Sequence, residues 1–169
     1  KKMDRFDPIE DRYYLENDDI LLVGSAEHTL GPLHMNEVLA AGDLPIRYIG
    51  YSTAFRREAG SYGKDTAGIL RRHQFDKAEM ETFARPEDGR AEQDLIVAIQ
   101  EYLVSQLELP YQVVAICTGD MGKPDYRQID IECFLPGQDQ YRETHTSDYM
   151  TDFQSRRLNI KYKKEDGGK

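Results

Sequence analysis

The pattern of hydrophobic and polar positions predicts a short strand near the N-terminus, followed by a long hairpin. The apolar run at residues 20–24, closed by Gly24, is typical of a buried strand. Residues 46–55 are rich in β-branched and aromatic side chains, and residues 69–83 alternate at most positions. These two segments are predicted to pair as antiparallel strands, with residues 56–68 as a charged, glycine-containing tip.

The segments on either side of the first strand lack a strand pattern. Residues 1–19 are mostly polar and are expected to form an irregular lead-in. Ser25 can cap a helix or turn, whose apolar positions extend to Val38 and Leu39 before Gly42 ends it. We therefore expect helical or turn structure between the first strand and the hairpin.

The second half of the chain begins with an amphipathic helix. This helix is expected to start at residues 85–88 and to end before Pro110, with Leu95, Ile99 and Leu103 on a core-facing apolar stripe. Four shorter strands are predicted at residues 111–117, 128–135, 141–144 and 159–162, with a short helix at residues 151–157. Because strands outnumber helices and neighbouring strands form hairpins, we predict an α+β fold: a largely antiparallel β-sheet flanked by helices.

Length and composition are those of one globular domain. With 169 residues, 39% hydrophobic and 31% charged, residues 1–169 are expected to form a single domain. No apolar run approaches the roughly 18 to 20 residues of a membrane-spanning helix, so we expect no membrane contact. Cys117 and Cys133 lack CxxC spacing, which favours a reducing, cytoplasmic location. The chain opens on two lysines rather than Met, and we expect a fragment of a longer protein.

The distribution of charge limits the polyanions that the chain can bind. The formal net charge is −9, which argues against a surface that grips nucleic acid over its whole extent. Residues 55–77, however, contain six basic and three acidic residues. The hairpin therefore provides the local basic patch that a phosphate group would need.

One face of the second hairpin strand combines three kinds of chemistry. Side chains two residues apart share a face, and the residues of this face are Arg71, His73, Phe75, Lys77 and Glu79. Arg56 and Glu58 are likewise expected to share a face. A basic side chain, an aromatic ring and an acidic side chain at four-residue spacing can contact, in that order, a phosphate, a flat ring and an ammonium group. A solvated hairpin crossed by ion pairs is an equally open alternative.

The same hairpin carries an extended family resemblance. It contains FRREAGS at residues 55–61, GKDT at residues 63–66 and RRHQFDKAE at residues 71–79, which closely resemble motif 2 of the class II seryl-tRNA synthetases. Shorter matches to this family lie at residues 25–27, 117–120, 141–143 and 152–157. The resemblance covers nearly all of the chain. It implies part of a class II catalytic domain, with motif 2 present and motifs 1 and 3 missing.

The resemblance implies an ATP site on the hairpin. By position in the motif, Arg56 would bind the α-phosphate and Arg71 the γ-phosphate. Glu58 would contact the adenine end, and Phe75 would stack on the adenine ring. Arg56 is one of the two residues to which the resemblance assigns a catalytic role.

The resemblance also implies a serine site and a magnesium site. Ser25, Glu27 and Glu79 would face the serine substrate. Glu143, the second residue with a catalytic role, would hold Mg²⁺ between phosphates. Thr146 stands where the family has a serine that contacts metal and substrate, so it is assigned to both sites.

The activity implied is that of a serine–tRNA ligase. Serine would be activated with ATP to seryl-adenylate and transferred to tRNA(Ser), which would be bound mainly by parts outside this chain, in a homodimeric full-length protein. The segment Thr144-His145-Thr146 departs from the family's serine-rich run, and Ser25 replaces a threonine. A non-catalytic, synthetase-like paralogue or fragment that binds a nucleotide or a partner without charging tRNA therefore remains an alternative.

Overall fold

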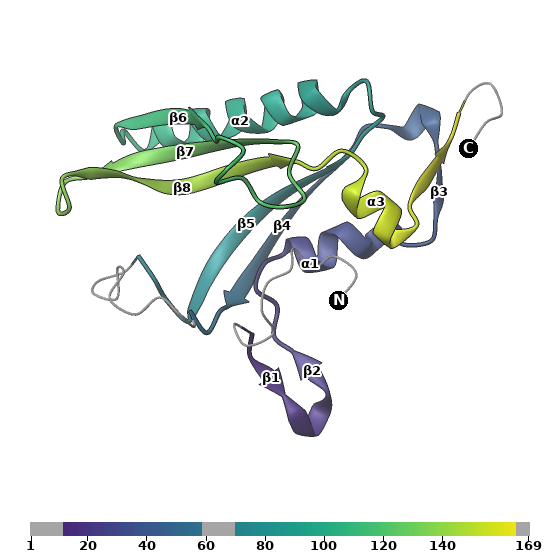
Figure 1. Cartoon of the computed structure of the whole chain (residues 1–169), viewed down its shortest axis with the longest axis horizontal. Coiled ribbons are helices and arrows are strands. Elements are labelled where there is room, and N and C mark those ends of the chain that lie inside the picture. Colours follow the sequence, from purple (N-terminus) through teal and green to yellow (C-terminus); the bar gives the residue numbers. More distant parts are fainter. Residues whose placement is uncertain (1–11, 59–69, 165–169) are drawn as a thin grey trace.

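Residues 12–58 and 70–164 are described by the structure, a computed structural model in which helices flank antiparallel strands (Figure 1). The strands are β1 (Tyr14–Leu15), β2 (Ile20–Leu21), β3 (Val38–Ala40), β4 (Ile46–Phe55), β5 (Gln74–Phe83), β6 (Tyr111–Ala115), β7 (Arg127–Leu135), β8 (Gln140–Tyr149) and β9 (Lys161–Lys163). The α-helices are α1 (Glu27–Leu30), α2 (Gly89–Gln106) and α3 (Phe153–Leu158), and short 3₁₀ turns are η2 (Glu16–Asp18), η3 (Gly31–His34) and η4 (Ala41–Asp43). The predicted α+β class is confirmed.

Two antiparallel sheets form the frame of the molecule. Strands β4 and β5 pair along their full lengths, from Ile46 opposite Phe83 to Phe55 opposite Gln74. Strands β6, β7 and β8 form a second sheet in that order. The predicted hairpin is confirmed, and β4 has the predicted bounds. Figure 1 shows the hairpin diverging from the three-stranded sheet, with α1 and α3 beside it.

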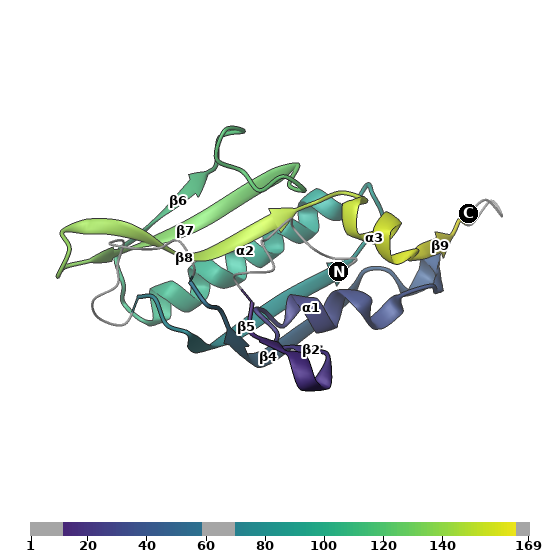
Figure 2. The ribbon, with the colours of Figure 1, turned by 60° about the horizontal axis from the view of Figure 1, so that its bottom comes forward.

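Helix α2 covers one face of the three-stranded sheet (Figure 2). Val104 of α2 packs with Ile131 and Cys133 of β7, and all three side chains are at most 2% exposed. The inner face of α2 also carries two buried amides that reach β8: Gln93 donates to the Ser147 carbonyl and Gln100 to the Thr146 carbonyl, each at 2.8 Å. No helix in the described part of the chain is long and apolar enough to cross a membrane.

The predicted core stripe of α2 is wrong. Leu95, Ile99 and Leu103 are 40%, 37% and 49% exposed, whereas Val97 and Val104 are buried. Helix α2 has apolar residues on two adjacent faces, and the hydrogen bonds of its glutamines turn the Val97–Val104 face toward β8. The sequence period therefore identified the helix correctly but not its buried face.

Two strand pairings that the sequence pattern did not predict involve short strands. Tyr14 and Leu15, expected in an irregular lead-in, form β1 and pair with β2. Val38 and Leu39, expected in a helix or turn, belong to β3, which pairs in parallel with β9. The helical structure that begins at Glu27 ends at His34, and a further 3₁₀ turn, η4, follows β3. The partner strand β9 lies more than 100 residues later, so the local pattern did not reveal it.

Strand bounds around the hairpin tip also differ from the prediction. Strand β5 begins at Gln74, so Arg71 and His73 precede it and do not follow its alternation. Glu58 has a left-handed backbone with φ of 52°, so the predicted common face of Arg56 and Glu58 does not apply. Most of the predicted tip loop, at residues 59–69, lies outside the described residues. Strand β8 is longer than the predicted segment 141–144.

Candidate functional site

The inward face of β5 carries an aromatic ring, an ammonium group and a carboxylate in a row. Phe75, Lys77 and Glu79 are partly buried, while the intervening residues Gln74, Asp76 and Ala78 are exposed. The predicted alternation is therefore confirmed for the part of this face that lies within the strand. It places three different side-chain chemistries along one line.

Arg56 lies over the aromatic end of this line. Its guanidinium carbon is 5.3 Å from the centre of the Phe75 ring, in a cation–π arrangement. Its backbone N–H donates to the His73 carbonyl at 3.0 Å, which extends the hairpin by one pair, and its Nε donates to the Gly24 carbonyl at 3.2 Å. The structure thus brings Arg56 and Phe75 together and ties Arg56 to the N-terminal segment.

Arg71 and Glu58 form an ion pair at the hairpin end. The Nη1 of Arg71 donates to Oε2 of Glu58 at 2.7 Å. The pair is partly exposed, with 42% of the Arg71 side chain accessible to solvent. Arg71 has five N–H donors, so it can engage an anion while it keeps this contact.

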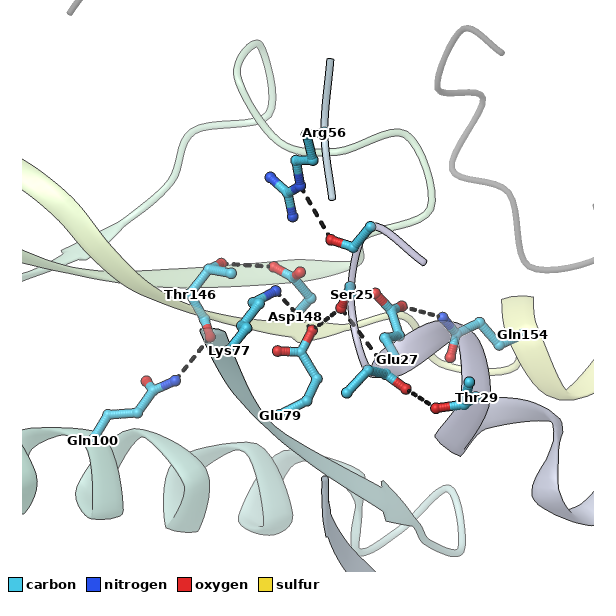
Figure 3. A network of polar contacts seen from close by, with 12 residues as sticks. Ser25, Glu27, Thr29, Arg56, Lys77, Glu79, Gln100, Thr146, Asp148 and Gln154 are labelled. Atoms are coloured by element: carbon cyan, nitrogen blue, oxygen red, sulfur yellow. Dashed lines mark hydrogen bonds and ion pairs between the residues drawn. The ribbon is translucent and has the colours of Figure 1, made fainter. Parts of the chain in front are cut away.

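The N-terminal segment supplies a hydroxyl at the acidic end of the line (Figure 3). Buried Ser25 donates its Oγ hydrogen to Oε1 of Glu79 and accepts a hydrogen bond from the Glu27 backbone N–H at 3.2 Å. This close approach depends on Gly50, which pairs with Glu79 across the hairpin. A Cβ at Gly50 would lie 2.9 Å from the Leu30 side chain, so a larger residue would force the packing of α1 on the hairpin to change.

Glu27 is held by a residue that sequence reasoning missed. Gln154 of α3 donates its Nε2 hydrogen to Oε1 of Glu27 at 2.6 Å, across 127 positions of sequence (Figure 3). Gln154 lies in a segment that resembles the family, but no spacing rule links the two residues. Only the folding of α3 beside α1 identifies this contact.

A β-bulge brings Glu143 and Thr146 to the same face of β8. Ile131 pairs with His145 and Glu132 with Glu143, which leaves Thr144 as an extra residue in β8. Without the bulge, residues three apart would point to opposite faces. Thr144 is anchored there by its Oγ1, which donates to the Ile131 carbonyl at 3.2 Å. The segment that departs from the family's serine-rich run is therefore the bulge itself.

The face of β8 that carries Glu143 is acidic. Burial raises the pKa of Glu143, and the nearby negative charges of Asp130 and Asp148 raise it further. The positive charges of Lys77 and Arg56 act in the opposite direction. The two sheets thus place carboxylates of β8 opposite cations of the hairpin.

Asp130 is a second residue that the sequence did not single out for the site. It is 5% exposed, pairs with Thr146 in the register of β7 and β8, and accepts a hydrogen bond from Gln128 at 3.1 Å. Its alternation with Ile129 and Ile131 was a visible signal, because an acid at a buried strand position requires partners.

The oxygen atoms near Glu143 suit a cation that takes some of its ligands from water or a substrate rather than from the protein. Within residues 12–58 and 70–164, no three His, Cys, Asp or Glu side chains are grouped so that they could enclose a metal ion. Glu143 and Thr146 share a face, and the Thr146 hydroxyl donates to Asp148 at 3.0 Å. Mg²⁺ is commonly bound by one or two carboxylates together with water and substrate phosphates. The donor set therefore fits Mg²⁺ as a partner of a bound polyphosphate.

Comparison with known proteins agrees with this arrangement. Residues 10–169 match the tRNA synthetase class II core domain (G, H, P, S and T). The serine–tRNA ligase of Thermobifida fusca is 49% identical over 155 residues, or 92% of this chain and 37% of that protein. The serine–tRNA ligase of Pyrococcus horikoshii is 45% identical over 94% of this chain and 35% of that protein.

Solved structures give the same result. The crystal structure of seryl-tRNA synthetase from P. horikoshii complexed with ATP has a TM-score of 0.92 at 44% identity, over 97% of this chain and 37% of that one. Cytoplasmic serine–tRNA ligase from Naegleria fowleri in complex with AMP has a TM-score of 0.91 at 34% identity. The chain spans a little over a third of the length of these relatives. The resemblance found in the sequence is confirmed, and the chain belongs to the class II tRNA synthetase core-domain family.

Proposed function

We propose that this chain is part of the catalytic domain of a serine–tRNA ligase, which activates serine with ATP and transfers it to tRNA(Ser). The observation that carries the proposal is the inward face of β5, where Arg56 and Phe75 at one end meet Glu79 and Ser25 at the other. A nucleotide and an amino acid can bind side by side on this face. The names of the relatives support serine as the amino acid.

The nucleotide half of the site is assigned to the hairpin. A base stacked on Phe75 would place its phosphates within reach of Arg56, which we assign to the α-phosphate. Arg71 is assigned to the γ-phosphate and Glu58 to the adenine end. Because Arg71 and Glu58 form an ion pair, these two assignments imply a bent ATP whose γ-phosphate folds back toward the adenine. The relative that was solved with ATP supports ATP as the nucleotide.

The amino-acid half is assigned to Ser25, Glu27, Glu79 and Thr146. Ser25 and Glu79 are hydrogen-bonded to each other, so their polar groups converge on one point. Glu27 is oriented by Gln154. Two carboxylates and two hydroxyls suit a small substrate that has an ammonium group and a hydroxyl.

Glu143 and Thr146 are the residues that would hold Mg²⁺. When bound, this cation would neutralise phosphate charge and orient the triphosphate. Glu143 stands among like charges that raise its pKa, so a cation at this position would favour its ionised form. This electrostatic environment supports the metal assignment independently of sequence position.

The reaction needs little proton transfer. A serine carboxylate oxygen attacks the α-phosphorus, the bond to the bridging oxygen breaks, and pyrophosphate leaves with the electron pair. Because the carboxylate is already ionised, the residues contribute by positioning the two substrates and by neutralising charge. Arg56 and Glu143 are the catalytic residues in this scheme.

Other properties are assigned to a full-length protein. We place tRNA(Ser) binding mainly, and homodimer contacts, outside this chain, with residues 1–169 as one part of the catalytic domain. We also place the protein in the cytoplasm. These assignments rest on the family relationship and on the share of the relatives that this chain covers.

Serine-dependent exchange of pyrophosphate into ATP tests the proposal. The full-length protein should catalyse exchange strongly and should prefer serine to threonine and alanine. An E143Q variant should lower the rate by roughly 30- to 1000-fold, as expected for loss of one strong electrostatic contact in the transition state. If the full-length protein binds ATP but exchanges with no amino acid, the non-catalytic alternative replaces this proposal.

A further inference from the structure

Lys77 occupies the centre of the site and has no role in the scheme above. It lies between Phe75 and Glu79 on the inward face of β5. We propose that Lys77 binds the α-carboxylate of the amino acid and forms, with Glu79, a subsite for its zwitterionic part. This inference rests on the proposed function and extends it to a further residue that contacts the substrate.

The order of residues along β5 supports this role. Side chains on one face of a strand are about 6.5 to 7 Å apart along the chain. Phe75 is assigned to the base and Glu79 to the amino acid, so the residue between them faces the junction of the two substrates. This junction is where the attacking carboxylate and the α-phosphate must meet.

The contact between Lys77 and Glu79 is complementary to an amino acid. Nζ of Lys77 lies 2.7 Å from Oε1 of Glu79, and the two side chains are only 32% and 15% exposed. A zwitterion presents an ammonium group and a carboxylate separated by one carbon atom. It can therefore insert between these two charges, giving its ammonium group to Glu79 and its carboxylate to Lys77.

The hydrogen-bonding capacity of Lys77 permits this exchange. An ammonium group has three N–H donors, and within the described segments 12–58 and 70–164 Lys77 donates a hydrogen bond to Glu79. Figure 3 shows Lys77 drawn between Glu79 and the β8 residues Thr146 and Asp148. A carboxylate can thus approach Lys77 while its link to Glu79 is kept or released.

The negative charges around the junction also favour a cation there. A carboxylate entering this region meets the negative side chains of Glu79 and Glu143, with Asp130 and Asp148 behind them. Like charges at such distances oppose binding. Arg56 is assigned to the α-phosphate, so Lys77 is the cation of β5 placed to offset this repulsion. Its ammonium group would hold one carboxylate oxygen while the other attacks phosphorus.

The test separates the carboxylate contact from the ammonium contact. In the full-length protein, calorimetry would measure binding of serine and of ethanolamine, which has the hydroxyl and ammonium groups but no carboxylate. K77M should weaken serine binding by about 10- to 100-fold, the usual worth of a charge-assisted hydrogen bond. Ethanolamine binding should be unchanged or tighter, because Lys77 no longer competes for Glu79. K161M, the same change at an exposed lysine of β9, should alter neither.

Equal weakening of serine and ethanolamine by K77M would overturn the inference, since Lys77 would then only orient Glu79. A second measurement needs no variant. On the wild-type protein, 3-hydroxypropionate, which has the hydroxyl and carboxylate but no ammonium group, should compete with serine, and absence of competition also overturns the inference. Failure of the proposed function looks different, because the wild-type protein would then show no serine binding and no exchange.

Discussion

At the scale of single residues, the charges of the site are divided between the β4–β5 hairpin and strand β8. Lys77 on β5 and Arg56 just after β4 provide cations, while Glu143 on β8 lies among like charges. Although much of Glu143 is exposed, partial shielding of its carboxyl group from water disfavours the ionised form and raises its pKa, as do Asp130 and Asp148. The resting protein therefore holds a carboxylate in a site that a cation would stabilise.

This arrangement predicts a pH-dependent stability in metal-free buffer. The pKa of Glu143 is higher in the folded protein than in the unfolded chain, so the folded state binds its proton more tightly. The contribution of Glu143 to the free energy of unfolding should therefore decrease as pH rises through the interval between the two pKa values, and then stay at the lower level. E143Q has no titrating group at this position, so it should lack this decrease and be more stable than wild type at neutral pH.

Thermal unfolding of the wild-type protein and E143Q between about pH 4 and pH 8 measures this effect. E87Q, a change at an exposed glutamate before α2, is the matched control and should follow wild type. An identical pH profile for wild type and E143Q would contradict the prediction.

At the scale of elements, the site depends on two close packings. α1 lies on the hairpin because Gly50 has no side chain, and this position lets Ser25 reach Glu79. The bulge at Thr144 turns Glu143 and Thr146 to a common face of β8.

G50A tests the first of these packings. The new methyl group would lie 2.9 Å from Leu30 Cδ1 and 3.3 Å from Ala26 Cβ, so the Leu30 side chain must shift and the packing of α1 on β4 is disturbed. We expect a loss of about 1 to 3 kcal/mol in the free energy of unfolding, as for other overpacked sites. In the full-length protein, KM for serine should rise more than KM for ATP, because Ser25 moves with α1.

G42A is the matched control, because nothing lies within 4 Å of a Cβ at that position. Its stability should be unchanged or slightly higher, since alanine restricts the unfolded chain. If G50A and G42A behave alike in denaturant unfolding, the close packing of α1 is not required.

At the scale of the whole molecule, the core lies between α2 and the three-stranded sheet, while apolar residues of the outer face of α2 are exposed. I131A should therefore cost about 2 to 5 kcal/mol, because it leaves a cavity beside Val104 and Cys133. L103A, at a position 49% exposed, should change stability by no more than about 0.5 kcal/mol in this chain.

Urea unfolding of both variants provides the comparison. The result that would contradict this core is a larger loss for L103A than for I131A, since the predicted stripe would then be the buried one. The pair is well matched because both substitutions remove a large aliphatic side chain.

Local patterns in the sequence were sufficient for much of the fold and for half of the site. Alternation predicted β4 with its bounds, the hairpin, and the common face of Phe75, Lys77 and Glu79. The helical period predicted α2, and the motif resemblance gave the family. These features depend on residues close together in the chain, so the sequence contains the information directly.

Tertiary structure decided the features that depend on a distant partner. β3 is a strand because β9 pairs with it, and Glu27 is oriented because α3 brings Gln154 beside it. The buried face of α2 was settled by its contacts with β8 rather than by its apolar residues, which occupy two faces. The bulge at Thr144 likewise exists only in the register of β8 against β7. The sequence by itself therefore determined the family, the hairpin and the residue types of the site. Packing between distant segments determined which of those residues meet. The reason is that a local hydrophobic period does not record the hydrogen bonds and the burial that form between segments far apart in the chain.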